Sequence, residues 1–255
     1  IRKAFKTGQI MVCIVINGSS LPYAEELCDD LMRFEAIKSV VINENTEKTN
    51  VILGKTCTTI WGEEYIEDIL CGVKIRLSPL SFYQVNHDMA ERLYKKAAEY
   101  AEPNGKNILD LYCGAGTIGL SMAKDAKSII GVEIVDAAVR DANINAQENN
   151  INNARFICGD AAQAALQLKN EKIKSDVVIL DPPRKGCDEQ LLNTVAKDFS
   201  PERIVYVSCD VSTQARDCAV LRELGYETVE VTPVDMFPRT AHVEGVCLFH
   251  KHTEI

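Results

Sequence analysis

The sequence predicts an α/β protein whose main part is a mostly parallel seven-stranded sheet, preceded by a small α/β domain. After Gly105, short apolar runs alternate with longer segments of helical periodicity, which is typical of a parallel sheet covered by helices on both faces. The segment Gly114-Ala-Gly116-Thr-Ile-Gly119 joins the first apolar run to the helical segment after it. The last run, Val243–His250, follows a loop rather than a helix, so we expect an antiparallel final strand.

The main domain is expected to span residues 106–255. Besides the final strand, its apolar runs predict strands at Asn107–Leu111, Ser128–Glu133, Ala154–Cys158, Asp176–Leu180, Arg203–Val207 and Glu227–Thr232. Its helical periodicity predicts helices at Thr117–Lys124, Asp136–Asn149, Ala161–Leu168, Glu189–Asp198 and Ser212–Leu224. Strands and helices therefore alternate along this whole part of the chain.

The small α/β domain is expected to span residues 1–77, with a connector and a helix over 78–105. Its predicted strands are Ile10–Ile16, Val40–Ile42, Val51–Leu53 and Ile69–Leu77. Helical spacing predicts one helix over Pro22–Phe34 and another, in the connector, over His87–Tyr100. The chain opens without an initiator methionine, so we expect a piece of a longer protein.

Composition is that of an ordinary water-soluble protein, with 46% apolar and 25% charged residues among 255. No apolar run approaches the roughly 18 residues that a membrane span needs, so no membrane association is expected. The ten cysteines are scattered without a Cys-x-x-Cys pair, which favours free thiols in the cytoplasm and no metal site. A net charge of −9 argues mildly against non-specific binding of nucleic acid.

The glycine segment alone fits a dinucleotide site, another cofactor site or a packing loop. Asp110 ends the strand before it, and a carboxylate there disfavours a pyrophosphate and favours a ligand with positive groups. Glu133 and Asp160 follow the next two strands, and the carboxyl ends of parallel strands line the ligand crevice of open α/β sheets. S-adenosylmethionine carries an ammonium, a sulfonium and no phosphate, so the acids favour it over NAD.

Two further segments place reactive groups at the same sheet edge. Asp181-Pro-Pro-Arg184 follows the fourth strand, where its prolines fix the chain direction, and Arg184 is expected to contact phosphates. Cys209 directly follows the fifth strand, which favours a role in the crevice over simple packing. Glu244 stands at the start of the last strand and is either a solvated charge at the rim of the sheet or a functional acid. Cys187 is expected in an exposed loop.

The ordered set of motifs resembles the RNA uracil-5-methyltransferases, which make 5-methyluridine in transfer and ribosomal RNA. The resemblance covers essentially the whole chain and rests on Phe82-Tyr-Gln84-x-Asn86, Asp110-Leu-Tyr-Cys-Gly114, Asp181-Pro-Pro-Arg184, Ser208-Cys209-Asp210 and Asp235-Met-Phe-Pro…His242-Val-Glu244. It implies a Rossmann-like class I methyltransferase fold and S-adenosylmethionine as the cofactor. It also implies RNA as the partner, with ribosomal RNA expected before transfer RNA.

The resemblance further implies a role for individual residues. Cys209 would be the nucleophile that adds to C6 of uracil, and Glu244 the general base that removes the proton from C5. Phe82 would stack near the target base, with Asp181 on the uracil edge. Cofactor contacts would come from Gln84, Tyr112, Thr117, Glu133, Asp160 and Asp181. Ribosomal members of the family often add an N-terminal RNA-binding barrel and an iron–sulfur cluster, which would lie upstream of this chain.

Three rival functions remain open. A cytosine-5 RNA methyltransferase usually has a second cysteine after the Asp-Pro of the fourth strand, where Pro183 stands here. An amino-methyltransferase usually carries an aromatic residue at the position of Arg184. A non-catalytic cofactor-binding module that serves as an RNA or protein partner would not need both Cys209 and Glu244.

Overall fold

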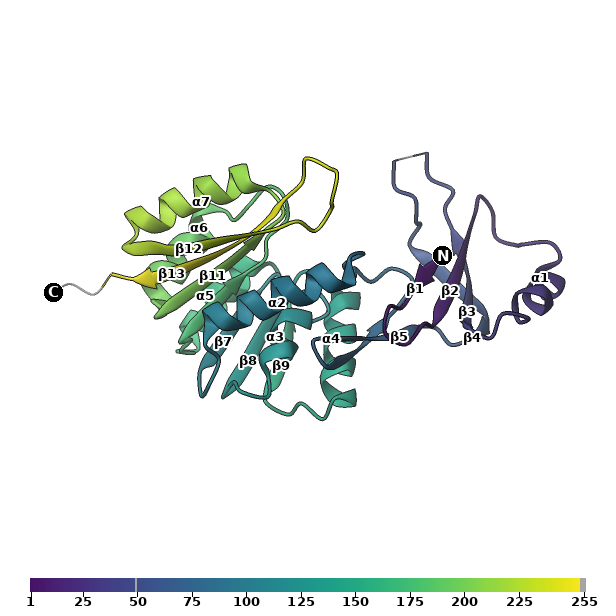
Figure 1. Cartoon of the computed structure of the whole chain (residues 1–255), viewed down its shortest axis with the longest axis horizontal. Helices are drawn as coiled ribbons and strands as arrows, with labels where there is room; N and C mark the ends of the chain where they lie inside the picture. Colours follow the sequence, from purple (N-terminus) through teal and green to yellow (C-terminus); the bar gives the residue numbers. More distant parts are fainter. Residues whose placement is uncertain (49, 253–255) are drawn as a thin grey trace. The chain divides into compact units, whose positions relative to one another are not determined.

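The computed structural model describes residues 1–48 and 50–252, and the chain divides into two compact units (Figure 1). The first unit comprises Ile1–Ile69 and Lys74–Tyr83. The second comprises Leu70–Val73 and Gln84–Ile255. Each unit has its own sheet, so each is described by itself.

The first unit is built on a four-stranded sheet in the order β1-β2-β3-β4. These strands are β1 (Arg2–Lys3), β2 (Ile10–Ile16), β3 (Ile37–Glu44) and β4 (Thr56–Gly62). Helix α1 (Ala24–Leu31) connects β2 to β3, which pair in parallel, whereas β1 and β4 are antiparallel to their neighbours. The apolar run Ile10–Ile16 thus forms the expected strand, and α1 is shorter than its predicted range.

Two strand predictions for this region were wrong. Val51–Leu53 is not a strand, because the side chain of Asn45 donates to the carbonyls of Val51 and Ile52 and holds them in a loop. The neighbouring strand is β4, rich in β-branched threonines that suit a half-buried sheet surface. The range Ile69–Leu77 is a hairpin of β5 (Ile66–Leu70) and β6 (Val73–Leu77). Its turn residues, at positions 71 and 72, have φ values of 50° and 79°, as a tight hairpin turn requires.

The second unit contains a seven-stranded sheet in the order β12-β13-β11-β10-β7-β8-β9. Its strands are β7 (Asn107–Leu111), β8 (Ser128–Glu133), β9 (Ala154–Cys158), β10 (Val177–Leu180), β11 (Arg203–Ser208), β12 (Tyr226–Val234) and β13 (Glu244–Lys251). The strands from β7 to β11 pair in parallel. The last strand, β13, inserts antiparallel between β11 and β12, which confirms the expected antiparallel ending.

Helices cover both faces of this sheet (Figure 1). The chain steps from β7 to β8 to β9 in one direction and then returns to β10 and β11, so right-handed crossovers place its connecting helices on opposite faces. One face carries α2 (His87–Ala101), α3 (Thr117–Met122) and α4 (Asp136–Glu148). The other carries α5 (Ala161–Asn170), α6 (Glu189–Asn193) and α7 (Val211–Glu223).

The expected helix over Glu189–Asp198 changes type within its length. It begins as α6, capped by the side chain of Asp188, which accepts from the backbone of Leu191 at 2.7 Å. It continues as the π-helical turn η1 (Thr194–Phe199). Buried side chains from β7, β10 and β11 pack with α5, α6 and η1 into one core that fixes the strand ends. Among the described residues, no helix is long and apolar enough to cross a membrane.

Candidate active site

The glycine segment forms a tight loop between β7 and α3. Gly116 has φ 77°, a conformation that glycine adopts readily, and an added Cβ would lie 2.7 Å from the ring of Phe156. Tyr112 stands at the start of this loop with φ 65°. Burial and the nearby Cys187, Asp188 and Asp160 groups hold its pKa above the ordinary tyrosine value. The loop therefore follows the strand end closely and carries Tyr112 toward Asp160.

Asp110 lies under this loop rather than in the open crevice. Its side chain is fully buried, and Oδ2 accepts from the backbone N–H of Gly119 at 3.0 Å. The other oxygen, Oδ1, has no hydrogen-bond partner among the described residues. Burial raises the pKa of Asp110 to about 7, the Gly119 N–H opposes the rise, and the Glu133 charge adds to it. A buried acceptor without a partner, at a loop expected to bind cations, fits a cofactor that carries positive charge.

The raised pKa of Asp110 predicts a pH-dependent stability. The folded protein holds the proton up to about pH 7 whereas the unfolded chain releases it near 3.8, so this group makes the protein less stable as pH rises through that window. Asparagine at position 110 stays neutral, so its variant does not lose stability through this titration. Relative to the wild type, the free energy of unfolding of Asp110→Asn should therefore rise by on the order of 2 kcal/mol from pH 5 to pH 8. Urea unfolding at both pH values measures this, with Asp125→Asn, an exposed residue, as control. Equal pH dependence in Asp110→Asn and the wild type would contradict the assignment.

Glu133 and Asp160 lie at the carboxyl ends of the neighbouring strands β8 and β9. Glu133 accepts from the backbone of Gly114 at 3.1 Å and from Val135 at 2.8 Å, so it ties the glycine loop to its own strand end. Asp160 caps α5 by accepting from Ala162 and Gln163, both at 3.1 Å. Each carboxylate is held in a fixed position and keeps lone pairs that can accept from hydroxyl or amino groups of a ligand.

Cys209 and Glu244 are neighbours across β11 and β13. Ser208 pairs with Gly245 in the antiparallel register, so the next position places Cys209 opposite Glu244, with both side chains on the same face. Cys209 is half-buried, and Glu244 is only 5% exposed. Burial raises the pKa of Glu244. Burial also raises the pKa of Cys209, the Glu244 and Asp181 charges add to the rise, and Arg184 opposes it.

Asp181 belongs to the same group of acids. It follows β10, and its carboxyl pKa lies well above the ordinary value because of burial and the charges of Glu244, Asp110 and Glu133. Several carboxyl groups therefore share one small region, and each makes ionisation of the others less favourable. Perturbed acids grouped beside a thiol are typical of a reaction site.

Helix α7 contacts the Asp181-Pro-Pro-Arg184 segment and the residues after it, and these contacts hold the segment in place. The hydroxyl of Thr213 donates to the carbonyl of Arg184 at 3.0 Å. Asp217, which is buried, accepts from the backbone of Cys187 at 2.8 Å and from the hydroxyl of Tyr206 at 2.6 Å. The prediction that Cys187 is exposed was wrong, because these bonds draw it into the core at 6% exposure. The side chain of Arg184 itself is exposed.

Of the remaining predicted site residues, Thr117 and Gln84 belong to the second unit and Phe82 belongs to the first. Thr117 donates to the hydroxyl of Tyr94 at 3.1 Å, and Gln84 lies half-buried ahead of α2. Asn86 caps α2 and also donates to the carbonyl of Met236, which joins α2 to the segment before β13. Phe82, by contrast, belongs to the first unit, and its side chain is 76% exposed.

Tyr94 is a site residue that the sequence reasoning missed. Its hydroxyl is buried on α2 and interacts with the charges of Asp181, Glu244 and Asp110. Burial raises its pKa, and the hydrogen bond from Thr117 opposes the rise. An aromatic residue on the apolar face of a helix is usually a packing residue, so no local signal distinguishes it from the core.

Comparison with known proteins identifies the family of this chain. The family model for tRNA (uracil-5-)-methyltransferase matches residues 23–252. Similar proteins include RNA methyltransferases of uncharacterised function from Clostridium tetani, 49% identical over 97% of this chain and 54% of the relative, and from Staphylococcus epidermidis, 48% identical over 100% and 56%. The chain thus spans about half the length of the curated relatives it matches.

Solved structures show the same likeness. The tRNA (uracil-54, C5)-methyltransferase of Pyrococcus abyssi in complex with S-adenosyl-L-homocysteine has a TM-score of 0.81 and 32% identity, over 97% of this chain and 58% of that one. A putative S-adenosylmethionine-dependent methyltransferase from Streptococcus mutans, 10% identical with a TM-score of 0.63 over 94% of this chain and 69% of that one, shows the fold alone. The second unit therefore has the Rossmann-like methyltransferase fold, and the chain belongs to the tRNA (uracil-5-)-methyltransferase family.

Proposed function

We propose that this chain carries the catalytic part of an enzyme that transfers a methyl group from S-adenosylmethionine to C5 of uracil in RNA. The observation that carries the proposal is the register of β11 and β13, which sets Cys209 opposite Glu244 on one face of the sheet. Asp181 lies near enough for its charge to act on Cys209. A non-catalytic binding module would have no need for a thiol, a buried acid and a second carboxyl at one place.

The residues present fit S-adenosylmethionine better than a phosphate-containing cofactor. The glycine loop lies among acids, with Asp110 beneath it and Glu133 bonded to it, so cationic groups are favoured there. We propose that cofactor contacts come from Gln84, Tyr112, Thr117, Glu133, Asp160 and Asp181. When bound, the cofactor supplies an electrophilic methyl group.

The side chains of this site supply the remaining steps. The Cys209 thiolate adds to C6 of uracil and makes C5 nucleophilic, which C5 alone is not. Glu244, held next to Cys209 by the strand register, removes the proton from C5 after methylation, and Cys209 then leaves. The half-buried Asp181 holds the uracil edge. The base must leave its stack to reach such a site.

Arg184 opposes part of the rise in the pKa of Cys209. Its charge lowers the pKa of Cys209, against the rise caused by burial and by the two acids. The side chain is exposed, so it is also free to meet a phosphate of the RNA backbone. We propose that Arg184 both contacts RNA and stabilises the reactive thiolate.

The test is methylation of RNA by the full-length protein, because this chain spans about half of its curated relatives. Transfer RNA and ribosomal RNA that lack the modification are incubated separately with labelled S-adenosylmethionine, and nucleosides are identified by mass spectrometry. We expect 5-methyluridine, with ribosomal RNA the preferred substrate. The similar Pyrococcus abyssi enzyme is named as a transfer RNA methyltransferase, so transfer RNA is the second substrate against which ribosomal RNA is compared. Label in 5-methylcytidine, in an exocyclic amine or in no nucleoside would overturn the proposal.

We also place the protein in the cytoplasm, where its RNA substrates occur and thiols stay reduced. The ten cysteines are scattered along the chain without a Cys-x-x-Cys pair, which is the feature that supports this proposal.

A further inference from the structure

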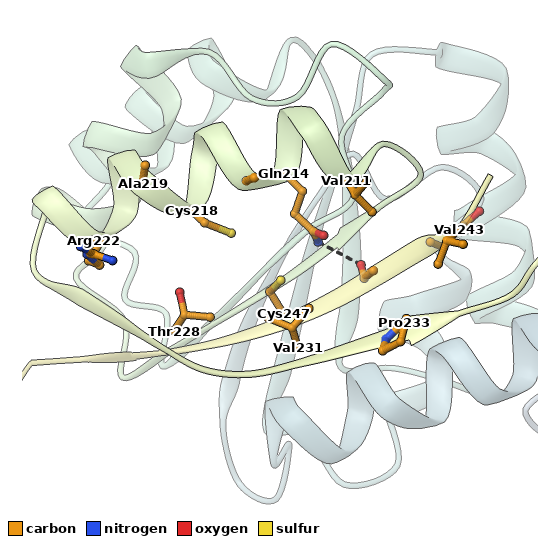
Figure 2. Close-up of a pocket in the computed structure, with 13 residues that line it drawn as sticks. Val211, Gln214, Cys218, Ala219, Arg222, Thr228, Val231, Pro233, Val243 and Cys247 are labelled. Atoms are coloured by element: carbon orange, nitrogen blue, oxygen red, sulfur yellow. Dashed lines mark hydrogen bonds between the residues drawn. The ribbon is translucent and has the colours of Figure 1, made fainter. Parts of the chain in front are cut away.

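Two cysteines line a pocket whose wall also includes Glu244 at the start of β13. The pocket has a volume of about 410 Å³ and lies between α7 and the strands β12 and β13. Cys218 enters it from the helix and Cys247 from β13, and Figure 2 shows their sulfur atoms directed toward each other. Among the described residues, no group of three or more His, Cys, Asp or Glu side chains is placed to hold a metal ion.

The two thiols differ in a way that suits stepwise oxidation. Cys218 is half-buried at the pocket wall, whereas Cys247 is only 1% exposed. The neighbouring Cys247 thiol lowers the pKa of Cys218, which makes Cys218 the more readily ionised of the two. The same interaction holds the pKa of Cys247 above its usual range. An accessible thiolate beside a resolving thiol is the arrangement found in redox-sensitive pairs.

The pair lies on the interface that positions Glu244. Figure 2 shows Cys218 one helical turn after Gln214 on α7. The side-chain amide of Gln214 donates to the carbonyls of Gly245 at 3.0 Å and Tyr206 at 3.2 Å. There is no spare room at that contact, because a Cβ on Gly245 would lie 2.4 Å from the amide oxygen of Gln214. A movement of α7 against β13 therefore displaces Gly245, and with it the neighbouring residue Glu244.

We propose that Cys218 and Cys247 form a redox modification site, at which a peroxide converts the two thiols into a disulfide that shifts β13 and reduces the activity of the proposed methyltransferase. The Cys218 thiolate attacks one oxygen of hydrogen peroxide, the O–O bond breaks, and hydroxide leaves to form water with a solvent proton. The sulfur of Cys247 then displaces hydroxide from the resulting sulfenic acid and gives up its own proton. The two thiols supply two electrons, and one peroxide yields two molecules of water.

The effect on activity follows from geometry and rests on the proposed function. A disulfide requires the two β-carbons to lie about 3.5–4.5 Å apart, so it fixes α7 to β13 at one separation. A displacement of about 1 Å at a reacting group costs on the order of a hundredfold in rate. We expect the methylation rate of the oxidised protein to fall at least about tenfold and to recover on reduction.

The test treats the full-length protein with hydrogen peroxide, removes the peroxide with catalase and maps disulfides by mass spectrometry. We expect a Cys218–Cys247 bond, a loss of methylation that dithiothreitol reverses, and no such loss in Cys218→Ser, whose untreated rate should match the wild type. Cys13 and Cys57 serve as an internal control, because β3 separates their strands and their spacing exceeds the reach of a disulfide.

Other outcomes separate this proposal from the proposed function. Absence of the mapped bond would overturn the modification site, and so would equal inactivation of Cys218→Ser, which would point to oxidation of Cys209 instead. If the disulfide is mapped but the methylation rate is unchanged, the claim that this disulfide reduces activity is overturned. If the untreated protein methylates no RNA, the proposed function fails, while disulfide mapping still decides whether the thiols form this site.

Discussion

Replacing Cys209 with alanine is expected to abolish the formation of 5-methyluridine while the protein still binds S-adenosylmethionine. The thiolate has no substitute, since C5 of uracil becomes nucleophilic only after addition at C6. We expect a loss on the order of 10⁴-fold or more in turnover. The glycine loop and its acids lie on other strands and keep their hydrogen bonds, so cofactor affinity should change little. Mass spectrometry of nucleosides measures the first effect, and calorimetric titration measures the second.

The matched control for this substitution is Cys13→Ala. Cys13 is also half-buried, but it lies on β2 of the first unit, so its loss should leave turnover unchanged. RNA that contains 5-fluorouridine gives an independent readout, because the fluorine cannot be removed as a proton and the adduct persists. We expect that adduct on Cys209. An adduct on Cys187, or loss of cofactor binding in Cys209→Ala, would show that Cys209 has a structural role.

Replacing Glu244 with glutamine is expected to trap the reaction after the methyl group has been transferred. Glutamine keeps the shape of the side chain but cannot accept the C5 proton, and general base catalysis contributes typically 10²–10⁴-fold. Turnover should fall by about that factor, and a covalent protein–RNA complex should accumulate. A denaturing gel measures the complex, and digestion of it should release a peptide that contains Cys209 bound to 5-methylated uridine.

Two variants make this result specific. Glu227→Gln changes an exposed acid on β12 and should behave as the wild type. Cys209→Ala combined with Glu244→Gln should form no complex, since the bond to the nucleophile is missing. Full activity of Glu244→Gln would remove the assignment of Glu244 as the base and leave it as a buried structural acid.

Much of the second unit could be predicted because most of its central strands, such as β7, β8 and β10, are largely buried. Such strands appear in sequence as short apolar runs bounded by turn residues, and the predicted ranges of β7 and β8 agree with the structure residue for residue. The predicted range of β9, a partly exposed edge strand, agrees as well. The first unit was harder, because its strands are half-exposed and lie near polar side chains. Asn45, for example, holds the apolar Val51 and Ile52 in a loop, and propensity carries no sign of this.

The candidate site divides in the same way. Asp181 and Cys209 could be placed from sequence, because a residue directly after a buried parallel strand lies at the carboxyl edge of the sheet whatever the order of the strands. Tyr94 could not, since its position beside Asp181 and Glu244 depends on how α2 packs on α3 and β13. The contact between Cys218 and Cys247 likewise depends on how α7 packs on β13.

By itself, the sequence determined the chemical groups of this protein and the strand ends at which they stand, because those depend on local apolar runs, glycines and prolines. Only the tertiary structure decided which of these groups meet. The insertion of β13 between β11 and β12, in a register that sets Cys209 opposite Glu244, arises from pairing between segments far apart in the chain. Such pairing is selected by the packing of the whole sheet and its helices, and no short stretch of sequence encodes it.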